Sequence, residues 1–142
     1  MGFAKAQGDP VGMVESFLEA ENRRDWELWT SFLALEVCYE VVGQEGMTMG
    51  REDYVLRMKR AYSEIPDWRF TVLRAHGDES SVMVEFDGSG HFTGDYGGEH
   101  HGGVLLRLQS VCIFELEGGL IRRVREYLDE AGFARQLRAP RR

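Results

Sequence analysis

The first third of the chain places apolar side chains at the spacing of amphipathic helices. Asp9 and Pro10 have the chemistry of a helix N-cap and a first helical position, which predicts that a helix begins there. Its stripe recurs every three or four residues and comprises Val11, Val14, Phe17, Leu18 and Glu21, with Phe17 and Leu18 on the buried side.

A second, shorter helix is predicted from Asp25, and a third over residues 51–63 after Gly50. The stripe of the second helix comprises Trp26, Trp29, Phe32 and Leu33, and that of the third comprises Tyr54, Val55, Met58, Ala61 and Tyr62. Side chains three and four residues apart share one helix face, so the first two helices are expected to pack as a hairpin.

From residue 68 onward the apolar residues mostly recur at every second position, as in strands with one buried face. The pattern predicts strands over 37–42, 68–74, 81–92, 105–117 and 120–129, and a final helical turn over 133–137. Gly118 and Gly119 favour a hairpin between the last two strands. Helices that precede a largely antiparallel sheet predict an α+β architecture, with a long, curved sheet that wraps around the helices.

The last predicted strand carries an acidic residue on its apolar face. A period of two places Val124, Glu126 and Leu128 on one side of the strand. Burial of an unpaired charge is unfavourable, so a carboxylate between apolar neighbours is either paired or functional. Glu126 is therefore the first candidate for chemistry, and an ion pair with Arg51 or Arg122 is the alternative. Asp129, by contrast, is expected to cap the final helix.

Composition narrows the class of protein. The 142 residues fit a single domain, 1–142, with a core over about 9–137 and a basic tail over 138–142. A net charge of -7 and a pI near 5.1 argue against binding to nucleic acid or to an anionic membrane. No apolar stretch approaches the roughly 20 residues of a membrane span, and residues 1–9 do not have a leader pattern, so we expect a cytoplasmic protein. Cys38 and Cys112 are expected to be free, buried thiols.

Short stretches along the chain are similar to motifs of a known superfamily. They are residues 24–27 (Arg-Asp-Trp-Glu) with Trp29, 50–52 (Gly-Arg-Glu), 65–70 (Ile-Pro-Asp-Trp-Arg-Phe), 88–94 (Gly-Ser-Gly-His-Phe-Thr-Gly), 125–129 (Arg-Glu-Tyr-Leu-Asp) and 136–137 (Gln-Leu). With these stretches in this order, residues 11–137 resemble the nuclear-transport-factor-2-like superfamily, and within it the group of SnoaL-like polyketide cyclases and ketosteroid isomerases. The resemblance implies a cone-shaped fold whose sheet and helices enclose an apolar pocket.

The resemblance also suggests positions for acid and base groups. Residues 40–43 (Glu-Val-Val-Gly) resemble the Asp-Pro-Val-Gly of ketosteroid isomerases, which places Glu40 where those enzymes have their base. Glu126 is similarly the counterpart of the last-strand acid of limonene epoxide hydrolases. Two carboxylates in one apolar pocket would differ in proton affinity, so that one could act as acid while the other acts as base. Our hypothesis is therefore an acid/base couple of Glu126 and Glu40, with His91 as a proton relay at the pocket rim.

Structural alternatives remain for Glu40 and His91. Glu40 could equally be a solvated residue paired with a neighbouring Arg, and His91 could satisfy backbone groups. The chain also departs from the related enzymes. Phe17 and Cys112 stand where ketosteroid isomerases have their oxyanion-binding Tyr and Asp, and neither is a strong donor. Cys112 also replaces the His of SnoaL-type cyclases, and residues 85–87 (Glu-Phe-Asp) do not include the Arg of epoxide hydrolases.

The expected substrate-binding side chains come from several elements and are Phe17, Tyr54, Met58, Cys112, Phe114 and Val124. We expect neither a cofactor nor a metal, because His91, His100, His101 and Glu99 do not have the spacing of a metal site. The expected partner is a small apolar metabolite. The predicted function is a cofactor-independent enzyme, of cyclase, isomerase, dehydratase or epoxide-hydrolase type, that acts on a carbonyl- or epoxide-bearing substrate. The alternative is a non-catalytic module for ligand binding or dimerisation.

A homodimer is the assembly that the resemblance implies. If Glu126 faces the pocket, the alternation of the last two strands places Val111, Ile113 and Tyr127 on the outer face of the sheet. An apolar patch at that place would favour a second subunit.

Overall fold

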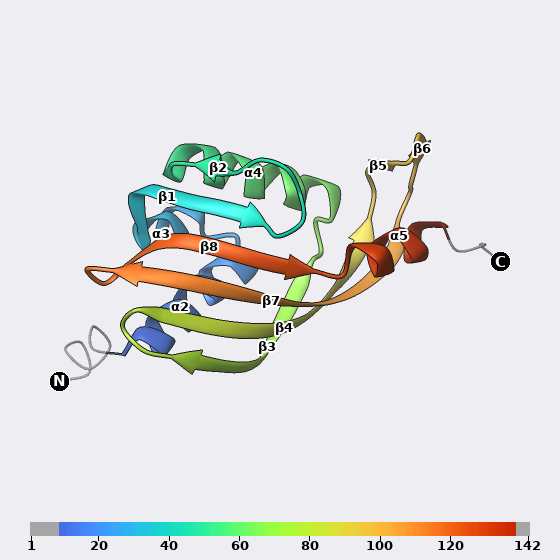
Figure 1. The fold of residues 1–142 in the computed structure, drawn as a ribbon. Coiled ribbons are helices and arrows are strands. Elements are labelled where there is room, and N and C mark those ends of the chain that lie inside the picture. The colour runs from blue at the N-terminus through green and yellow to red at the C-terminus, as the bar shows by residue number, and fades with distance from the viewer. Residues whose placement is uncertain (1–8, 139–142) are drawn as a thin grey trace.

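The computed structural model describes residues 9–138, and Figure 1 shows the order of the elements. The helices are α2 (Pro10–Asn22), α3 (Trp26–Ser31), α4 (Arg51–Glu64) and α5 (Glu130–Arg138). The strands are β1 (Leu33–Val41), β2 (Thr48–Met49), β3 (Arg69–Gly77), β4 (Ser81–Phe92), β5 (Asp95–Tyr96), β6 (Glu99–His100), β7 (Val104–Glu117) and β8 (Leu120–Leu128). The basic tail predicted over 138–142 lies outside the described residues beyond Arg138.

Side-chain caps begin three of the helices where the sequence predicts them. An Asp9 carboxylate oxygen accepts from the Gly12 amide at 3.0 Å, and Asp25 accepts from the Leu28 amide at 3.2 Å. Each bond satisfies an amide that has no partner within the first turn of a helix. The expectation that Asp129 caps the last helix is confirmed, since its carboxylate accepts from the Gly132 amide at 2.8 Å.

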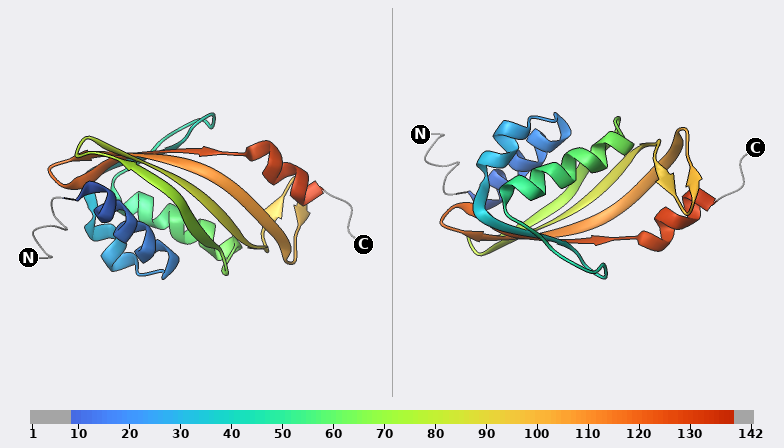
Figure 2. Two further views of the ribbon diagram at one scale, coloured as in Figure 1. Left: turned by 90° about the horizontal axis from the view of Figure 1, so that it is seen from below. Right: turned by 90° about the horizontal axis from the view of Figure 1, so that it is seen from above.

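The main sheet has six strands in the order β2-β1-β8-β7-β4-β3. Only the β1 and β8 pair is parallel within this sheet, and the other neighbours are antiparallel. The sheet is strongly curved, with α2, α3 and α4 on one side and α5 at its far end (Figure 2). These features confirm the α+β fold with N-terminal helices on a curved, largely antiparallel sheet.

Observed strand bounds follow the predictions most closely where the alternation is regular. β4 covers the predicted 81–92, and β8 ends one residue before the predicted end. β1 differs most, because it begins at Leu33, a residue that helical spacing assigned to the second helix. Leu33 pairs with Ile121 of β8, and the exposed fraction of each residue is at most 1%. Pairing with β8 therefore determines the secondary structure of a segment whose local pattern is ambiguous.

The core lies between the helices and the inner face of the sheet. Its centre is aromatic: the ring of Phe17 stacks on Trp29 at 5.0 Å and meets Phe114 edge to face at 5.9 Å. A second, smaller cluster of Phe92, Leu106 and Leu137 lies where α5 packs on β7. Within residues 9–138, no helix combines the length and the apolar character that crossing a membrane would require.

Candidate functional site

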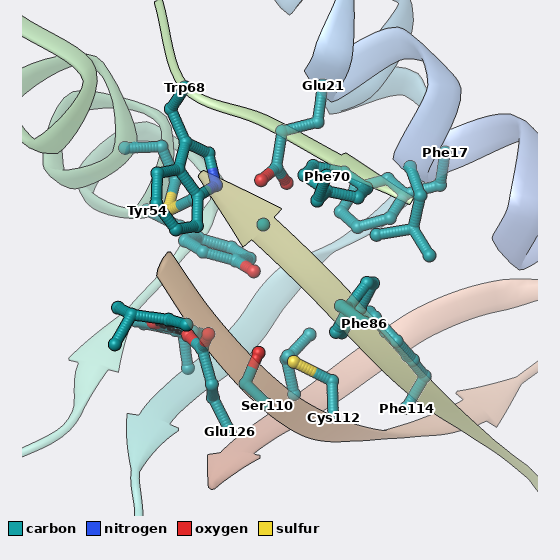
Figure 3. Close-up of a pocket in the computed structure, with 16 residues that line it drawn as sticks. Phe17, Glu21, Tyr54, Trp68, Phe70, Phe86, Ser110, Cys112, Phe114 and Glu126 are labelled. Carbon is teal, nitrogen blue, oxygen red and sulfur yellow. Dashed lines mark hydrogen bonds between the residues drawn. The ribbon is translucent and has the colours of Figure 1, made fainter. Parts of the chain in front are cut away.

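A cavity opens between the helices and the inner face of the sheet, lined by aromatic and aliphatic side chains with two carboxylates (Figure 3). Its volume is about 50 Å³. A second cavity, of about 240 Å³, adjoins it and shares Tyr39, Met58, Trp68 and Glu126 with it. A single water molecule needs roughly 10 to 15 Å³ of cavity volume. The first, inner cavity therefore admits only a small molecule or one end of a larger molecule.

Glu126 reaches the cavity from β8. Its strand neighbours are Val41 on one side and Cys112 on the other, and both of these residues are buried. The Tyr39 hydroxyl donates a hydrogen bond to the Glu126 carboxylate. Burial raises the pKa of Glu126, and this hydrogen bond and the charge of Arg57 oppose the rise only in part. The alternative, an ion pair of Glu126 with Arg122, is not formed, because Arg122 binds Glu115 at 2.7 Å.

Glu21, near the end of α2, brings a second carboxylate to the same cavity. The Trp29 indole nitrogen donates to one of its oxygens at 3.0 Å, and the Tyr62 hydroxyl donates to the other at 2.5 Å. Burial raises the pKa of Glu21 to about 7, against the effect of both hydrogen bonds, and the charge of Glu126 adds to the rise. Burial thus raises the pKa of both carboxyl groups in the cavity above its ordinary value.

Glu40 does not face the cavity, and the prediction of an inward register for it is wrong. The neighbouring residues in β1, Tyr39 and Val41, are buried, so the alternation of the strand turns Glu40 to the outer face. There the Glu40 carboxylate binds Arg123 at 2.6 Å and Arg125 at 3.1 Å. The hydrogen bond from Arg123 lowers the pKa of Glu40. The alternative of an ion pair with a neighbouring Arg is confirmed.

His91 is also turned away from the cavity, so its predicted place at the rim is wrong. In β4 its neighbours Gly90 and Phe92 are buried, whereas the imidazole is 54% exposed. Its Nδ1 lies 2.6 Å from an Asp67 carboxylate oxygen, and its amide donates to the other oxygen at 2.8 Å. His91 therefore ties β4 to the segment before β3. Within residues 9–138, no group of His, Cys, Asp and Glu side chains is arranged to hold a metal ion.

The side chains expected to bind substrate all line the cavity, namely Phe17, Tyr54, Met58, Cys112, Phe114 and Val124. The lining residues that sequence reasoning did not select as site residues include Glu21, Tyr39, Trp68, Phe70, Phe86 and Ser110. For Glu21 a signal existed, because it lies four residues after Phe17 on the predicted helical stripe.

Comparison with known families agrees with this fold. The model of the SnoaL-like polyketide cyclase family matches residues 11–137. The chain belongs to this family. A search of curated protein sequences finds no significant match.

Solved structures of similar fold carry several different descriptions. A presumed SnoaL-like polyketide cyclase from Jannaschia sp. CCS1 aligns with a TM-score of 0.83 and 16% identity, over 93% of each chain. An epoxide hydrolase of M. tuberculosis, described as LEH-like, aligns with a TM-score of 0.72 and 20% identity, over 90% of this chain and 88% of that one. A presumed ketosteroid isomerase from Kribbella flavida aligns with a TM-score of 0.64 and 28% identity, over 84% and 76%. The first two likenesses, at such low identity, concern the fold alone.

Proposed function

We propose that this member of the SnoaL-like family is a cofactor-independent enzyme that moves a proton on a small, largely apolar metabolite. The observation that carries the proposal is the environment of Glu126. Its carboxylate lies in an apolar cavity, is held by the Tyr39 hydroxyl, and has a raised pKa without an ion-pair partner among the described residues. A proton-transfer group works best with a pKa near the working pH, and burial produces that shift here.

Glu21 takes the place that our sequence hypothesis gave to Glu40. It lines the same cavity as Glu126, and the charge of Glu126 disfavours ionisation of Glu21. One group can then hold a proton while the other accepts one, as acid/base chemistry requires. Isomerisation, cyclisation, dehydration and epoxide opening all need such an exchange, so the proposal covers carbonyl- and epoxide-bearing substrates.

The two cavities set the shape of the substrate. The inner cavity of about 50 Å³ holds the reacting end, and the adjoining cavity of about 240 Å³ accommodates the remainder. Met58 and Trp68 line both volumes and form apolar walls between them. We therefore expect a substrate with one small reacting group and an apolar extension.

The test is turnover of a panel of ketones, enones and epoxides by the parent protein and by Glu126→Gln. We expect the substitution to lower kcat by at least about 100-fold with little change in ligand binding, because general acid/base catalysis contributes 10²- to 10⁴-fold. Glu40→Gln makes the same chemical change on the outer face and should leave kcat unaltered. Full turnover by Glu126→Gln would refute the proposal, and binding without any turnover would favour the non-catalytic module.

We also propose that the protein forms a homodimer through the outer face of β7 and β8. The side chain of Tyr127 is 40% exposed there, beside its strand partner Val111, and Ile113 lies on the same face. Burial of such a patch against a second copy would be favourable. Light scattering should give the mass of two chains, and a monomer at working concentration would contradict this assembly.

A further inference from the structure

The Tyr54 hydroxyl faces the cavity and makes no hydrogen bond with any described residue. Tyr54 is 2% exposed, and its ring is fixed by stacking on Tyr39 at 4.6 Å and by an edge contact with Trp29 at 4.7 Å. Those contacts involve the ring alone, and the hydroxyl makes no hydrogen bond within residues 9–138. In Figure 3 it points into the middle of the cavity, between Glu21 and Ser110.

The Trp68 indole N–H is a second donor without a partner in the described part of the chain. The main chain at Trp68 is fixed by Arg24, whose guanidinium donates to the Trp68 carbonyl at 2.7 Å. The indole packs over Gly88, where a Cβ atom would lie only 2.3 Å from the ring. Figure 3 shows the indole nitrogen turned toward the cavity, on the side of Glu21.

Two such donors in one small cavity indicate an acceptor that the protein itself does not supply. A donor that faces a cavity and has no protein partner is satisfied there by water or by a ligand. A carbonyl oxygen has two lone pairs in one plane and can accept from both donors. The inner cavity is lined by Glu21 and Glu126 and by no described Lys or Arg, which disfavours an anionic ligand; a neutral oxygen acceptor is compatible with this lining.

We propose that the Tyr54 hydroxyl and the Trp68 indole N–H together bind a carbonyl oxygen of a small, neutral ligand deep in the cavity. This inference rests on the proposed function and narrows its substrate class from carbonyl or epoxide compounds to carbonyl compounds. Tyr54 and Trp68 fix the oxygen, and the reacting carbon then lies toward the carboxylates.

The experiment compares two probes of the same shape, cyclopentanone and methylenecyclopentane, by NMR titration of the parent protein. The hydrocarbon reports on the size and apolar character of the cavity, and the ketone adds only the oxygen. The ratio of the two dissociation constants therefore isolates the contribution of the hydrogen bonds. A 13C-labelled carbonyl carbon should shift downfield on binding, relative to the same ketone in a hydrocarbon solvent.

Tyr54→Phe removes one donor and keeps the ring contacts. It should weaken ketone binding about fivefold relative to hydrocarbon binding, as expected for the loss of one hydrogen bond of about 1 kcal/mol. Trp68→Phe should also reduce the ketone preference. Tyr127→Phe makes the same change on the exposed outer face and should leave the ratio unaltered. Retained hydrocarbon binding by Tyr54→Phe would show that the cavity is intact.

The proposal is overturned if the ratio is the same in Tyr54→Phe and in the parent, or if neither probe displaces water from the cavity. It is overturned equally if Ser110→Ala, rather than Tyr54→Phe, abolishes the ketone preference. Stronger binding of cyclopentene oxide than of cyclopentanone would assign the site to epoxides instead. Because these measurements need no turnover, ketone binding through Tyr54 in a protein without activity would refute the proposed enzyme but not this site.

Discussion

The two faces of the β1 and β8 pair place a glutamate in opposite environments. Glu126 on the inner face lies in an apolar cavity with a Tyr hydroxyl as its partner, and burial raises its pKa. Glu40 on the outer face lies between Arg123 and Arg125, which lower its pKa. The residues are close in the register, because Glu40 pairs with Arg125 and Val41 pairs with Glu126. Glu40 and Glu126 are thus offset by one residue in the register of the two strands. This offset places one in a surface ion pair and makes the other a candidate acid/base group.

This contrast shows why the second carboxylate of the cavity comes from a helix. The buried positions of β1 are Leu33, Val37, Tyr39 and Val41, so this strand carries no acid on its inner face. The end of α2 crosses the opposite wall of the cavity and carries Glu21 there, supported by Trp29 of α3 and Tyr62 of α4. The second carboxylate of the cavity thus comes from helix α2 across the core rather than from the neighbouring strand β1.

The largest expected effect comes from placing a charge on the inner face. Val124→Asp introduces a carboxylate at a side chain that is 1% exposed and should lower the free energy of unfolding by at least about 3 kcal/mol. Ile113→Asp makes a similar change on the outer face of β7, where the side chain is only partly buried within one chain, and should cost less at concentrations at which the protein is monomeric. Denaturant titration of both variants measures the difference. Equal losses would mean that the outer face is as well covered as the inner one.

An intermediate effect is expected from Glu21, as a change in the pH dependence of stability. Its pKa is about 7 in the folded state, above the ordinary 4.5, so the folded protein binds this proton more tightly than the unfolded chain. The resulting stabilisation is complete below about pH 4 and is lost as pH rises to about 7, by about 3 kcal/mol in total. Glu21→Gln cannot lose a proton, so unfolding measured from pH 4 to 8 should show a smaller decline than in the parent.

The control for this measurement is Glu19→Gln, two residues earlier on α2. The Glu19 side chain is 69% exposed and has only an ion pair with Arg23 at 3.6 Å. Its substitution should leave the slope of stability against pH unchanged. If Glu21→Gln shows the full slope of the parent, Glu21 is ionised in the folded protein, and Glu126 would be the only proton-holding group in the cavity.

Alternation along the strands predicted most of the fold. Residues 81–92 alternate strictly, and the observed β4 has the predicted bounds. The same rule, applied to residues 39–41, places Tyr39 and Val41 inward and Glu40 outward, as the structure does. The likeness of residues 40–43 to a short motif points to an inward Glu40, and the local alternation points to the orientation that the structure has.

Other parts of the site depend on contacts that the sequence does not indicate. Tyr39 and Glu126 are 87 residues apart, and their hydrogen bond requires the parallel pairing of β1 with β8. The predicted sheet was largely antiparallel, and its pattern did not specify which strands are neighbours. Trp68 likewise reaches the cavity only because Gly88, on the adjacent strand β4, leaves room for the indole. Such positions follow from register and packing rather than from periodicity.

The smallest effect is expected from Glu40→Gln, and its pH dependence should have the opposite sign to that of Glu21. The folded-state pKa of Glu40 lies below its ordinary value, so its contribution is present above about pH 4.5 and is lost as pH falls through the folded-state pKa. The ion pairs of Glu40 are partly exposed and screened by solvent, so the variant should be only slightly less stable than the parent at pH 7 and equal to it in strong acid. Glu36→Gln, on the same strand and exposed, should match the parent throughout. If instead Glu40→Gln changed stability as much as Glu21→Gln, the ion pairs of Glu40 would contribute as much as the buried carboxyl group, and the contrast between the two faces would fail.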